Sequence, residues 1–560
     1  MAEVVFIQPG IPGERSKAPS LGSTENLGLG YLAAITLRAG HAAHIVDADG
    51  EGLSPEVATA RAIDVRADIV CIAPVAESMG AALEIAKRIK GSAKRPFVAF
   101  GGHHASNCYR DILENDPQVD AVALGDAERT FEDLLAGWPR VKPSSSFITR
   151  ENLGDSGHRR HQEMDLDSVP WPHRPGLGTP AYGDEARMIT SRGCPYRCAF
   201  CTTPTMYDTL ARRSIGDVIE EMRHLRRHGV KHIWLNDDLF VVGSNQGVAR
   251  VHEFCAALRK ADIGVSFRPM ARVDSFRKDP GLVDELIAAG MSHIFLGIES
   301  GSDADLLRLQ KDADAADNLR TLEFLYEKDV FVQIGFIMFN PWSGFRDLRD
   351  NVAFLAETGE GYRPFPYFRS LSVFPGTAVW SQLAKDGLQG SATYKSGSSL
   401  DYAFADPRVE VLSRLQHRAY DQIAVLDSGI YRTASRLRRS GDISGWRAHR
   451  TAGVEMNTRF FEHILTLAEN GTLSQGTHSR VLAEYRDQLQ NLVGVQEGVG
   501  GTRVRAARPL GIQIGSQHAQ RTAHHRRRSR ADIPPARRGR GDRAHVDVQL
   551  SLCGVQPQAR

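Results

Sequence analysis

Residues 191–201 read S-R-G-C-P-Y-R-C-A-F-C and place Cys194, Cys198 and Cys201 at the spacing C-x₃-C-x₂-C. Three thiolates at this spacing can bind three irons of a [4Fe–4S] cluster and leave the fourth iron without a protein ligand. An iron with an open position can bind and reduce a small molecule, whereas a fourth thiolate would restrict the cluster to electron transfer. The sequence therefore predicts a reactive iron–sulfur centre in this segment.

Two other uses of these cysteines are disfavoured. The chain has seven cysteines in 560 residues, and its first residues lack the basic region of a secretory signal, so a disulfide framework is not expected. A zinc site needs a fourth ligand, and no second C-x₂-C or H-x₃-H pair follows at a usable spacing. We expect Cys71, Cys108 and Cys255 to be ordinary buried thiols.

Length and composition predict a cytoplasmic protein of two or three domains with no membrane span. The hydrophobic content of 42% is sufficient for real cores, and the formal net charge is +2. Residues 501–560 differ from the rest, because they contain 13 Arg, no Lys and 3 Asp, a net charge of +10. The first 500 residues therefore carry a net charge of 2 − 10 = −8. We predict that this basic tail is disordered. It has no aromatic residues between its arginines, so nucleic-acid binding is not favoured.

Short apolar segments alternate with helical patterns over residues 1–135. The expected strands are residues 4–8, 44–47, 69–73, 97–100 and 121–124, with helices such as 29–38 and 81–89 between them. This alternation predicts a parallel, doubly wound, Rossmann-like α/β sheet, whose ligands bind at the carboxyl ends of the strands. The loops expected to matter are 9–13, 47–52, 74–80 and 101–106.

A second strand–helix series follows a polar, proline-rich linker at 136–185. Its expected strands are residues 187–190, 232–236, 265–270, 293–298, 331–338 and 368–373, and its helices include 215–228 and 280–288. Six such units predict a partial (β/α)₆ barrel of the TIM type over 186–385, with its site at the carboxyl ends of the strands. Residues 386–500, which include the helical pattern 460–467, are expected to be a helical C-terminal region.

The cysteine segment resembles the signature of the radical S-adenosylmethionine (SAM) enzymes. The segment H-I-F-L-G-I-E-S-G (293–301) is similar to the fourth strand of that family, N-D-D (236–238) to the end of its second strand, and P-G-T (375–377) to the turn after its sixth. Residues 339–344 (F-N-P-W-S-G) replace the glycine-rich segment of many relatives. The resemblance implies SAM binding by Phe200, Asn236, Asp238, Glu299 and Ser300, and cluster binding by the three cysteines.

The first domain resembles the cobalamin-binding domain of class B radical SAM enzymes. The matching segments are 29–33 (L-G-Y-L-A), 46–47 (V-D), 100–104 (F-G-G-H-H) and 119–128 (V-D-A-V-A-L-G-D-A-E). The residues implied to bind cobalamin are Pro9, Asp47, Ser78, Gly101, Gly102, His104, Gly125 and Glu128. No D-x-H-x-x-G motif occurs, so the implied cobalamin has no histidine ligand on its lower face, and neither His103 nor His104 is expected to bind cobalt.

The combined resemblance implies a cobalamin-dependent radical SAM methyltransferase of antibiotic biosynthesis. Such an enzyme moves a methyl group from SAM, through methylcobalamin, to an unactivated carbon or a phosphinate phosphorus of a small-molecule substrate. An electron donor such as flavodoxin or ferredoxin is expected, and no catalytic residue beyond the cofactor ligands is assigned. Two alternatives stay open: a cobalamin-binding radical SAM enzyme that forms or rearranges a ring, and a cofactor-binding sensor that contacts nucleic acid through the tail.

Overall fold

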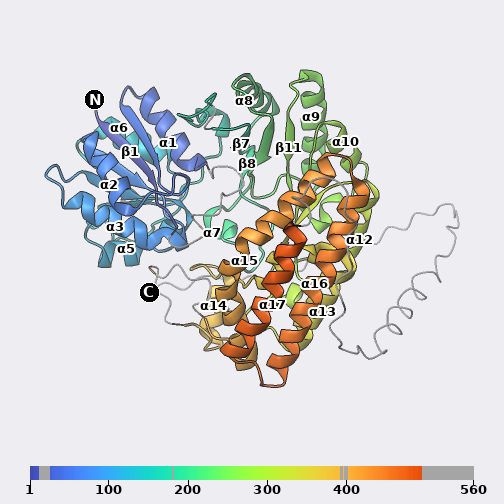
Figure 1. Cartoon of the computed structure of the whole chain (residues 1–560). Coiled ribbons are helices and arrows are strands. Elements are labelled where there is room, and N and C mark those ends of the chain that lie inside the picture. Colours follow the sequence, from blue (N-terminus) through green and yellow to red (C-terminus); the bar gives the residue numbers. More distant parts are fainter. Residues whose placement is uncertain (12–24, 180–181, 391–394, 396–401, 495–560) are drawn as a thin grey trace, which may run out of the picture. The chain divides into compact units, whose positions relative to one another are not determined.

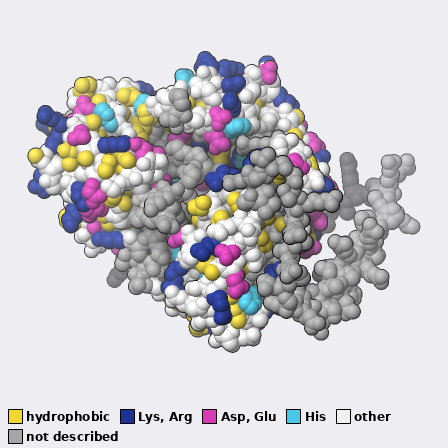
Figure 2. All heavy atoms as spheres, viewed as in Figure 1, with side chains coloured by type: hydrophobic (Ala, Val, Ile, Leu, Met, Phe, Trp, Pro, Cys, Tyr) yellow, Lys and Arg dark blue, Asp and Glu magenta, His cyan; other side chains and the backbone are white. Residues whose placement is uncertain are grey.

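The computed structural model describes residues 1–11, 25–179, 182–390, 395 and 402–494 (Figure 1). The basic tail predicted for 501–560 lies outside these residues. Within them, no helix has the length and apolar character needed to cross a bilayer. On the face seen in Figure 2, basic and acidic side chains of the described residues are intermixed.

The N-terminal region forms a six-stranded sheet in the order β2-β1-β3-β4-β5-β6. Five strands are parallel, and β6 pairs antiparallel with β5. The strands are β1 (Glu3–Gln8), β2 (Ala42–Asp47), β3 (Ile69–Ile72), β4 (Phe97–Phe100), β5 (Ala121–Ala123) and β6 (Phe147–Thr149). The helices are α1 (Leu27–Arg38), α2 (Pro55–Asp64), η2 (Ala76–Ser78), α3 (Met79–Lys90), α4 (Gly102–Asn107), α5 (Tyr109–Asn115) and α6 (Glu128–Gly137).

Side chains that alternate along these strands are buried on both faces of the sheet, as a doubly wound fold requires. In β1, Val5 and Ile7 join the core formed with α2, α3 and α5, whereas Val4 and Phe6 join the core formed with α1 and α6. The five predicted parallel strands are confirmed. Strand β6 differs from the prediction, because it lies within the expected linker 136–185, where the short segment F-I-T is buried against β5.

The second region contains two three-stranded parallel sheets, β11-β10-β7 and β12-β13-β14, and the antiparallel pair β8-β9. Its strands are β7 (Glu185–Met188), β8 (Ser191–Arg192), β9 (Ala211–Arg212), β10 (His232–Leu235), β11 (Ser266–Arg268), β12 (Met270–Arg272), β13 (Ile294–Glu299) and β14 (Val332–Phe336). Its helices are η3 (Leu166–Ser168), α7 (Thr203–Met206), α8 (Ile215–Arg227), α9 (Asn245–Ala261), η4 (Val273–Phe276), α10 (Leu282–Ala288), α11 (Asp303–Arg308), α12 (Ala315–Glu327), α13 (Phe345–Thr358), η5 (Glu360–Tyr362), η6 (Phe365–Phe368) and α14 (Ala378–Lys385).

Two expected strands of this barrel differ from the prediction. The strand 265–270 is split into β11 and β12 at Pro269, which has no N–H to donate to a ladder. The prediction of a sixth strand at 368–373 is wrong, because the segment forms one isolated parallel bridge, between Ser370 and Phe339. In this segment, the backbone of Arg369 and Leu371 is hydrogen-bonded to Met338 and Phe339, which follow β14.

Three long helices complete the described chain, as predicted for 386–500. They are α15 (Pro407–Arg439), α16 (Ile443–Glu469) and α17 (Gln475–Gly494). Buried side chains of all three, including Ile423, Phe461 and Leu489, belong to the same core cluster as the strands of the second region. The helical region therefore shares the barrel's core, packing on α13, η5 and η6, rather than forming a core of its own.

Candidate functional site

The cysteine loop begins where β7 and β8 end. Gly193 precedes Cys194 with φ +92°, a conformation that favours glycine, and a Cβ at this position would lie 2.2 Å from the carbonyl oxygen of Thr209. Cys201 N donates to Cys198 O at 3.1 Å, which folds the loop between the last two cysteines. All three thiols are half-buried. The loop therefore depends on a glycine immediately before its first cysteine.

Two aspartates after β10 hold this loop. The carboxylate of Asp238 accepts from Gly193 N at 2.9 Å and from Thr203 Oγ1 at 2.6 Å, so it ties together the two ends of the cysteine segment. Asp237 is 1% exposed and accepts from Thr190 N, Thr190 Oγ1 and Ser191 Oγ, each at 2.6 Å. The end of the second barrel strand thus fixes the loop that follows the first.

The thiols lie among groups that suit an iron–sulfur cluster. Arg272 Nη1 donates to Cys198 Sγ at 3.1 Å, and Thr203 N donates to Cys201 Sγ at 3.4 Å. Burial raises the pKa of Cys194 to about 11, so binding a metal centre would release its proton. Among the described residues, no three His, Cys, Asp or Glu side chains converge closely enough for a single metal ion. The donor set, three thiolates on one short loop, is the one that a [4Fe–4S] cluster with an open iron uses.

A cavity of about 690 Å³ lies between the strand ends of the first sheet and the residues that flank the cysteine loop. Its walls include Ala73–Glu77, Phe100–His104 and Gly125–Glu128 from the first region, and Thr202, Met206, Tyr207, Asn236 and Asp238 from the second. This volume is typical of a ligand site. The cavity is thus lined by both regions at the ends of their parallel strands, where ligands of such folds bind.

Two observations show that the cavity fits a large ligand with polar groups. A Cβ added to Gly102, which has φ +86°, would meet no atom within 4 Å, so the backbone borders open space. The Gln8 side-chain oxygen at the end of β1 is buried without a hydrogen-bond partner and lines the cavity. A corrin needs such close backbone approach, and its amide groups can donate to an orphaned oxygen.

The predicted cobalamin residues divide into two groups. Five line the cavity: Gly101, Gly102, His104, Gly125 and Glu128. Pro9, Asp47 and Ser78 are not among the lining residues. Asp47 accepts from Gly50 N at 2.8 Å within its own turn, and Ser78 bonds to the backbone of Val75 at the start of α3. The resemblance implied that these two bind cobalamin; in the structure their side chains make local turn contacts, and the binding roles stay predictions.

The predicted SAM residues are similarly divided. Asn236 and Asp238 line the cavity, and Phe200 packs against the barrel core. Glu299 ends β13 with φ +68° at a register shift, and Lys311 Nζ lies 3.3 Å from its carboxylate. Such strain in a non-glycine residue is typical of functional positions. Ser300 is fully buried and its hydroxyl donates to Asn351 Oδ1 at 2.7 Å. These binding roles stay predictions.

Arg192 is a site residue that sequence reasoning missed. It directly precedes Gly193, is 7% exposed, and its guanidinium pairs with Asp126 at 3.1 Å and Glu128 at 2.6 Å. It also lies over the Tyr31 ring, 5.1 Å from the centroid. Its position next to the cysteine motif could have identified Arg192 as a site residue. Its carboxylate partners, however, are more than sixty residues away in the sequence.

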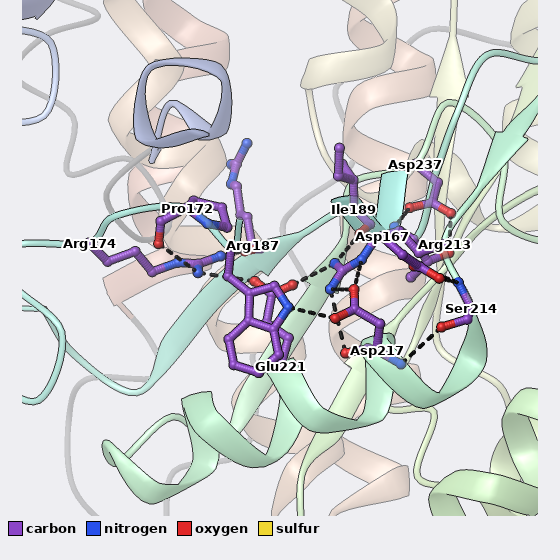
Figure 3. A network of polar contacts seen from close by, with 12 residues as sticks. Asp167, Pro172, Arg174, Arg187, Ile189, Arg213, Ser214, Asp217, Glu221 and Asp237 are labelled. Atoms are coloured by element: carbon purple, nitrogen blue, oxygen red, sulfur yellow. Dashed lines mark hydrogen bonds and ion pairs between the residues drawn. The ribbon is translucent and has the colours of Figure 1, made fainter. Parts of the chain in front are cut away.

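A buried ion-pair network supports the first barrel strand (Figure 3). Glu221 is completely buried and pairs with Arg174 at 3.0 Å and Arg213 at 2.5 Å. Arg174 Nη2 donates to Arg187 O at 2.7 Å, and Arg213 Nη1 donates to Ile189 O at 2.8 Å. Helix α8 and the segment before β7 therefore fix the backbone on which the cysteine loop is built.

Comparison with known families agrees with this arrangement. Residues 17–135 match the B12 binding domain, and residues 188–343 match the radical SAM superfamily. The chain resembles a solved structure of the cobalamin-dependent SAM radical enzyme OxsB, with a TM-score of 0.67 and 18% identity over 89% of this chain and 80% of that one. At this identity the likeness shows a shared fold.

Sequence relatives include enzymes with different reactions. An uncharacterized methyltransferase of Pyrococcus horikoshii is 23% identical over 71% of this chain and 85% of its own length. An anaerobic magnesium-protoporphyrin IX monomethyl ester cyclase of Cereibacter sphaeroides is 24% identical over 60% of this chain and 56% of its own. A cytidylyl-2-hydroxyethylphosphonate methyltransferase of Streptomyces wedmorensis is 26% identical over 51% of this chain and 64% of its own. The chain thus combines a B12 binding domain with a domain of the radical SAM superfamily.

Proposed function

We propose that this enzyme is a methyltransferase that places a methyl group from SAM on an unactivated carbon, or a phosphinate phosphorus, of an antibiotic biosynthetic intermediate. The observation that supports it is a cavity lined both by predicted cobalamin loops and by Ser191, Arg192 and Thr202, which flank the cysteine loop. When bound, the cluster and SAM supply a 5′-deoxyadenosyl radical, and cobalamin supplies the methyl group. A shared cavity would let both act on one substrate atom.

The chain's own residues position these groups. Cys194, Cys198 and Cys201 would bind the cluster, while Asp238 fixes both ends of their loop. Gly101 and Gly102 leave room at the cavity wall for a corrin. Arg192 and its carboxylate partners hold the wall next to the cysteine loop. We expect flavodoxin or ferredoxin to donate the electrons.

An oxidative ring-forming reaction is the second candidate, because one relative is a cyclase. The two reactions differ in their use of SAM. A methyltransferase that supplies both the methyl group and the radical from SAM yields S-adenosylhomocysteine and 5′-deoxyadenosine, whereas a cyclase does not need the first product. The radical SAM match favours either enzyme over a cofactor-binding sensor.

The test is anaerobic purification, reconstitution with iron, sulfide and cobalamin, and incubation with SAM and a strong reductant. Both S-adenosylhomocysteine and 5′-deoxyadenosine should form, and Cys198→Ala should abolish the deoxyadenosine. The matched control is Cys255→Ala, a buried thiol of α9 outside the cavity lining, which should retain both products. Deoxyadenosine without S-adenosylhomocysteine would favour the cyclase, and neither product would contradict both candidates.

A further inference from the structure

Three side chains form a row across the first three barrel strands. The register pairs Arg187 of β7 with Trp234 of β10, and Trp234 with Arg268 of β11. Neighbouring residues Ala186, Ile233 and Phe267 belong to the core that packs on the surrounding helices. Because side chains alternate between the two faces of a strand, the row Arg187–Trp234–Arg268 faces the interior of the barrel.

Both arginines contact the same indole ring. The guanidinium carbon of Arg268 is 3.8 Å from the Trp234 ring centroid, and that of Arg187 is 5.0 Å from it. Both positive charges therefore lie against one indole ring. Arg268 is also 5.8 Å from the Phe295 ring, so an aromatic surface extends beneath it.

Neither guanidinium has a counterion among the described residues. Within the described residues, no carboxylate lies within ion-pair distance of Arg187 or Arg268. The side chains of these two arginines also form no hydrogen bond with any described residue. Arg268 is 8% exposed, and its Nη1 is buried without a partner. Glu25, whose charge acts on Arg187, is bound to Arg174 at 2.6 Å. The other carboxylate acting on both arginines, Glu185, forms no ion pair with them.

This arrangement is unfavourable without an anion. Buried cations in proteins are paired, because removing a charge from water costs several kcal/mol. Burial, with the like charge of Arg187, lowers the pKa of Arg268 to about 10. A fold that retains a buried Arg268 and a half-buried Arg187 against one ring is expected to use them on a ligand.

The row is connected to the cavity. Arg187 is itself a lining residue, together with Ile189, Asn236 and Asp238. Its backbone is held by Arg174, while its guanidinium points away from that ion-pair network in Figure 3. A substrate bound at Arg187 can therefore extend toward the wall formed by Asn236 and Asp238.

We propose that Arg187 and Arg268 bind a phosphate or phosphonate group of the substrate, with Trp234 as the platform between them. That the bound molecule is the substrate rests on the proposed function. Two guanidinium groups match the charge of a dianion and the several oxygens of a tetrahedral phosphorus group. A single carboxylate would leave one of the two positive charges without a counterion.

The test is binding of methylphosphonate to the reconstituted holoenzyme with SAM present, followed by the broadening of its ³¹P resonance. The wild type should show saturable broadening, with acetate a poorer competitor than inorganic phosphate. Arg268→Gln and Arg187→Gln should each weaken binding at least about tenfold, the effect of losing one charge-assisted contact. The control Arg226→Gln, on the exposed side of α8, should bind as the wild type does.

Several outcomes would overturn the proposal. They are the absence of saturable broadening, equal binding by wild type and both variants, or stronger competition by acetate than by phosphate. A comparable loss of SAM affinity in equilibrium dialysis would instead assign the pair to the SAM carboxylate. Arg268→Gln should raise the unfolding temperature because it removes an unpaired buried charge. If it fails to fold, Arg187→Gln alone decides.

The same samples separate this inference from the proposed function. Wild-type protein that binds methylphosphonate but forms neither 5′-deoxyadenosine nor S-adenosylhomocysteine would contradict the proposed function and retain the anion site. Protein that forms both products but does not bind methylphosphonate would contradict the anion site alone.

Discussion

Arg192 Nη2 lies 2.6 Å from Glu128 Oε1, and this ion pair joins the start of the cysteine loop to the first residue of α6. Both side chains are 8% exposed. Glu128 was expected to contact cobalamin, and it lines the cavity, but one of its oxygens is already used by Arg192. Asp126 shares the same guanidinium at 3.1 Å. The pair is therefore part of the wall of the cavity that both regions line.

Replacing Arg192 by Met should destabilise the protein strongly. It would leave two buried carboxylates without their cation, for which the expected cost is about 3–5 kcal/mol. The free energy of unfolding in urea measures the loss. The matched control is Arg61→Met, which breaks an exposed pair with Glu51 and should cost below about 1 kcal/mol. Equal costs for the two variants would show that the buried pair is not a strong constraint.

Gly193→Ala should prevent the cysteine loop from forming. The positive φ strains an L residue by about 1–3 kcal/mol, and the added Cβ would also meet the Thr209 carbonyl oxygen. We expect iron bound after reconstitution to fall several-fold, as measured by metal analysis and absorbance. Gly216→Ala in α8, where a Cβ meets nothing within 4 Å, should keep full iron content. Normal iron content in Gly193→Ala would contradict the role assigned to the glycine.

The five parallel strands of the first sheet were predictable because each is a short buried run between helical patterns. The cysteine loop was predictable because its spacing is local. The partners of Asp238 and Arg192 were not predictable, since they depend on contacts between residues 35 to 66 positions apart. The same limit explains why the contact of Ser300 was not predicted. The strand ends at its neighbour Glu299, and the Ser300 hydroxyl donates to Asn351, 51 positions away.

The sixth strand shows how composition can mislead. Residues 368–373 (F-R-S-L-S-V) form a short segment with aromatic and aliphatic side chains, and Phe368 and Leu371 are indeed buried. Their backbone, however, has few ladder partners, because Met338 and Phe339 both donate to the single carbonyl of Arg369. Tyr402 donates to the carbonyl of Leu371 instead of a neighbouring strand. Burial was predicted correctly, and hydrogen-bond partners were not.

The stability of the helical region should fall in mild acid because of His478. Burial lowers its pKa to about 4, and its Nε2 lies 2.9 Å from Gln416 Oε1 between α17 and α15. Since the unfolded value is about 6.5, the unfolded chain binds a proton that the folded chain excludes between these pH values. Stability is thus complete above about pH 6.5 and is lost as the pH falls, by about 2 kcal/mol at pH 5.

Urea unfolding at pH 5 and at pH 7.5 checks this prediction. His478→Gln, which can keep a hydrogen bond to Gln416, should show a smaller difference between the two pH values than the wild type. His228→Gln, at an exposed position after α8, is the matched control and should not change the difference. An identical pH dependence in His478→Gln and wild type would mean that other groups cause the acid loss.

Arg272→Leu should lower the reduction potential of a cluster bound by the three cysteines. Arg272 is 6% exposed, donates to Cys198 Sγ at 3.1 Å, and lies 3.8 Å from the Tyr196 ring centroid. A reduced cluster has one more negative charge than the oxidised form, so a neighbouring cation and N–H···S bond stabilise it. Removing a contact worth about 1 kcal/mol should shift the potential by roughly −50 mV.

A redox titration followed by electron paramagnetic resonance measures this shift. The control Arg277→Leu removes an exposed arginine, five residues after Arg272, that pairs with Asp317. The cluster of this variant should keep the wild-type potential. The iron content of both variants must match the wild type, because Arg272 is not a ligand. A potential that stays constant or rises in Arg272→Leu would show that the arginine does not stabilise the reduced cluster, and its contact with Cys198 would then serve only to orient the loop.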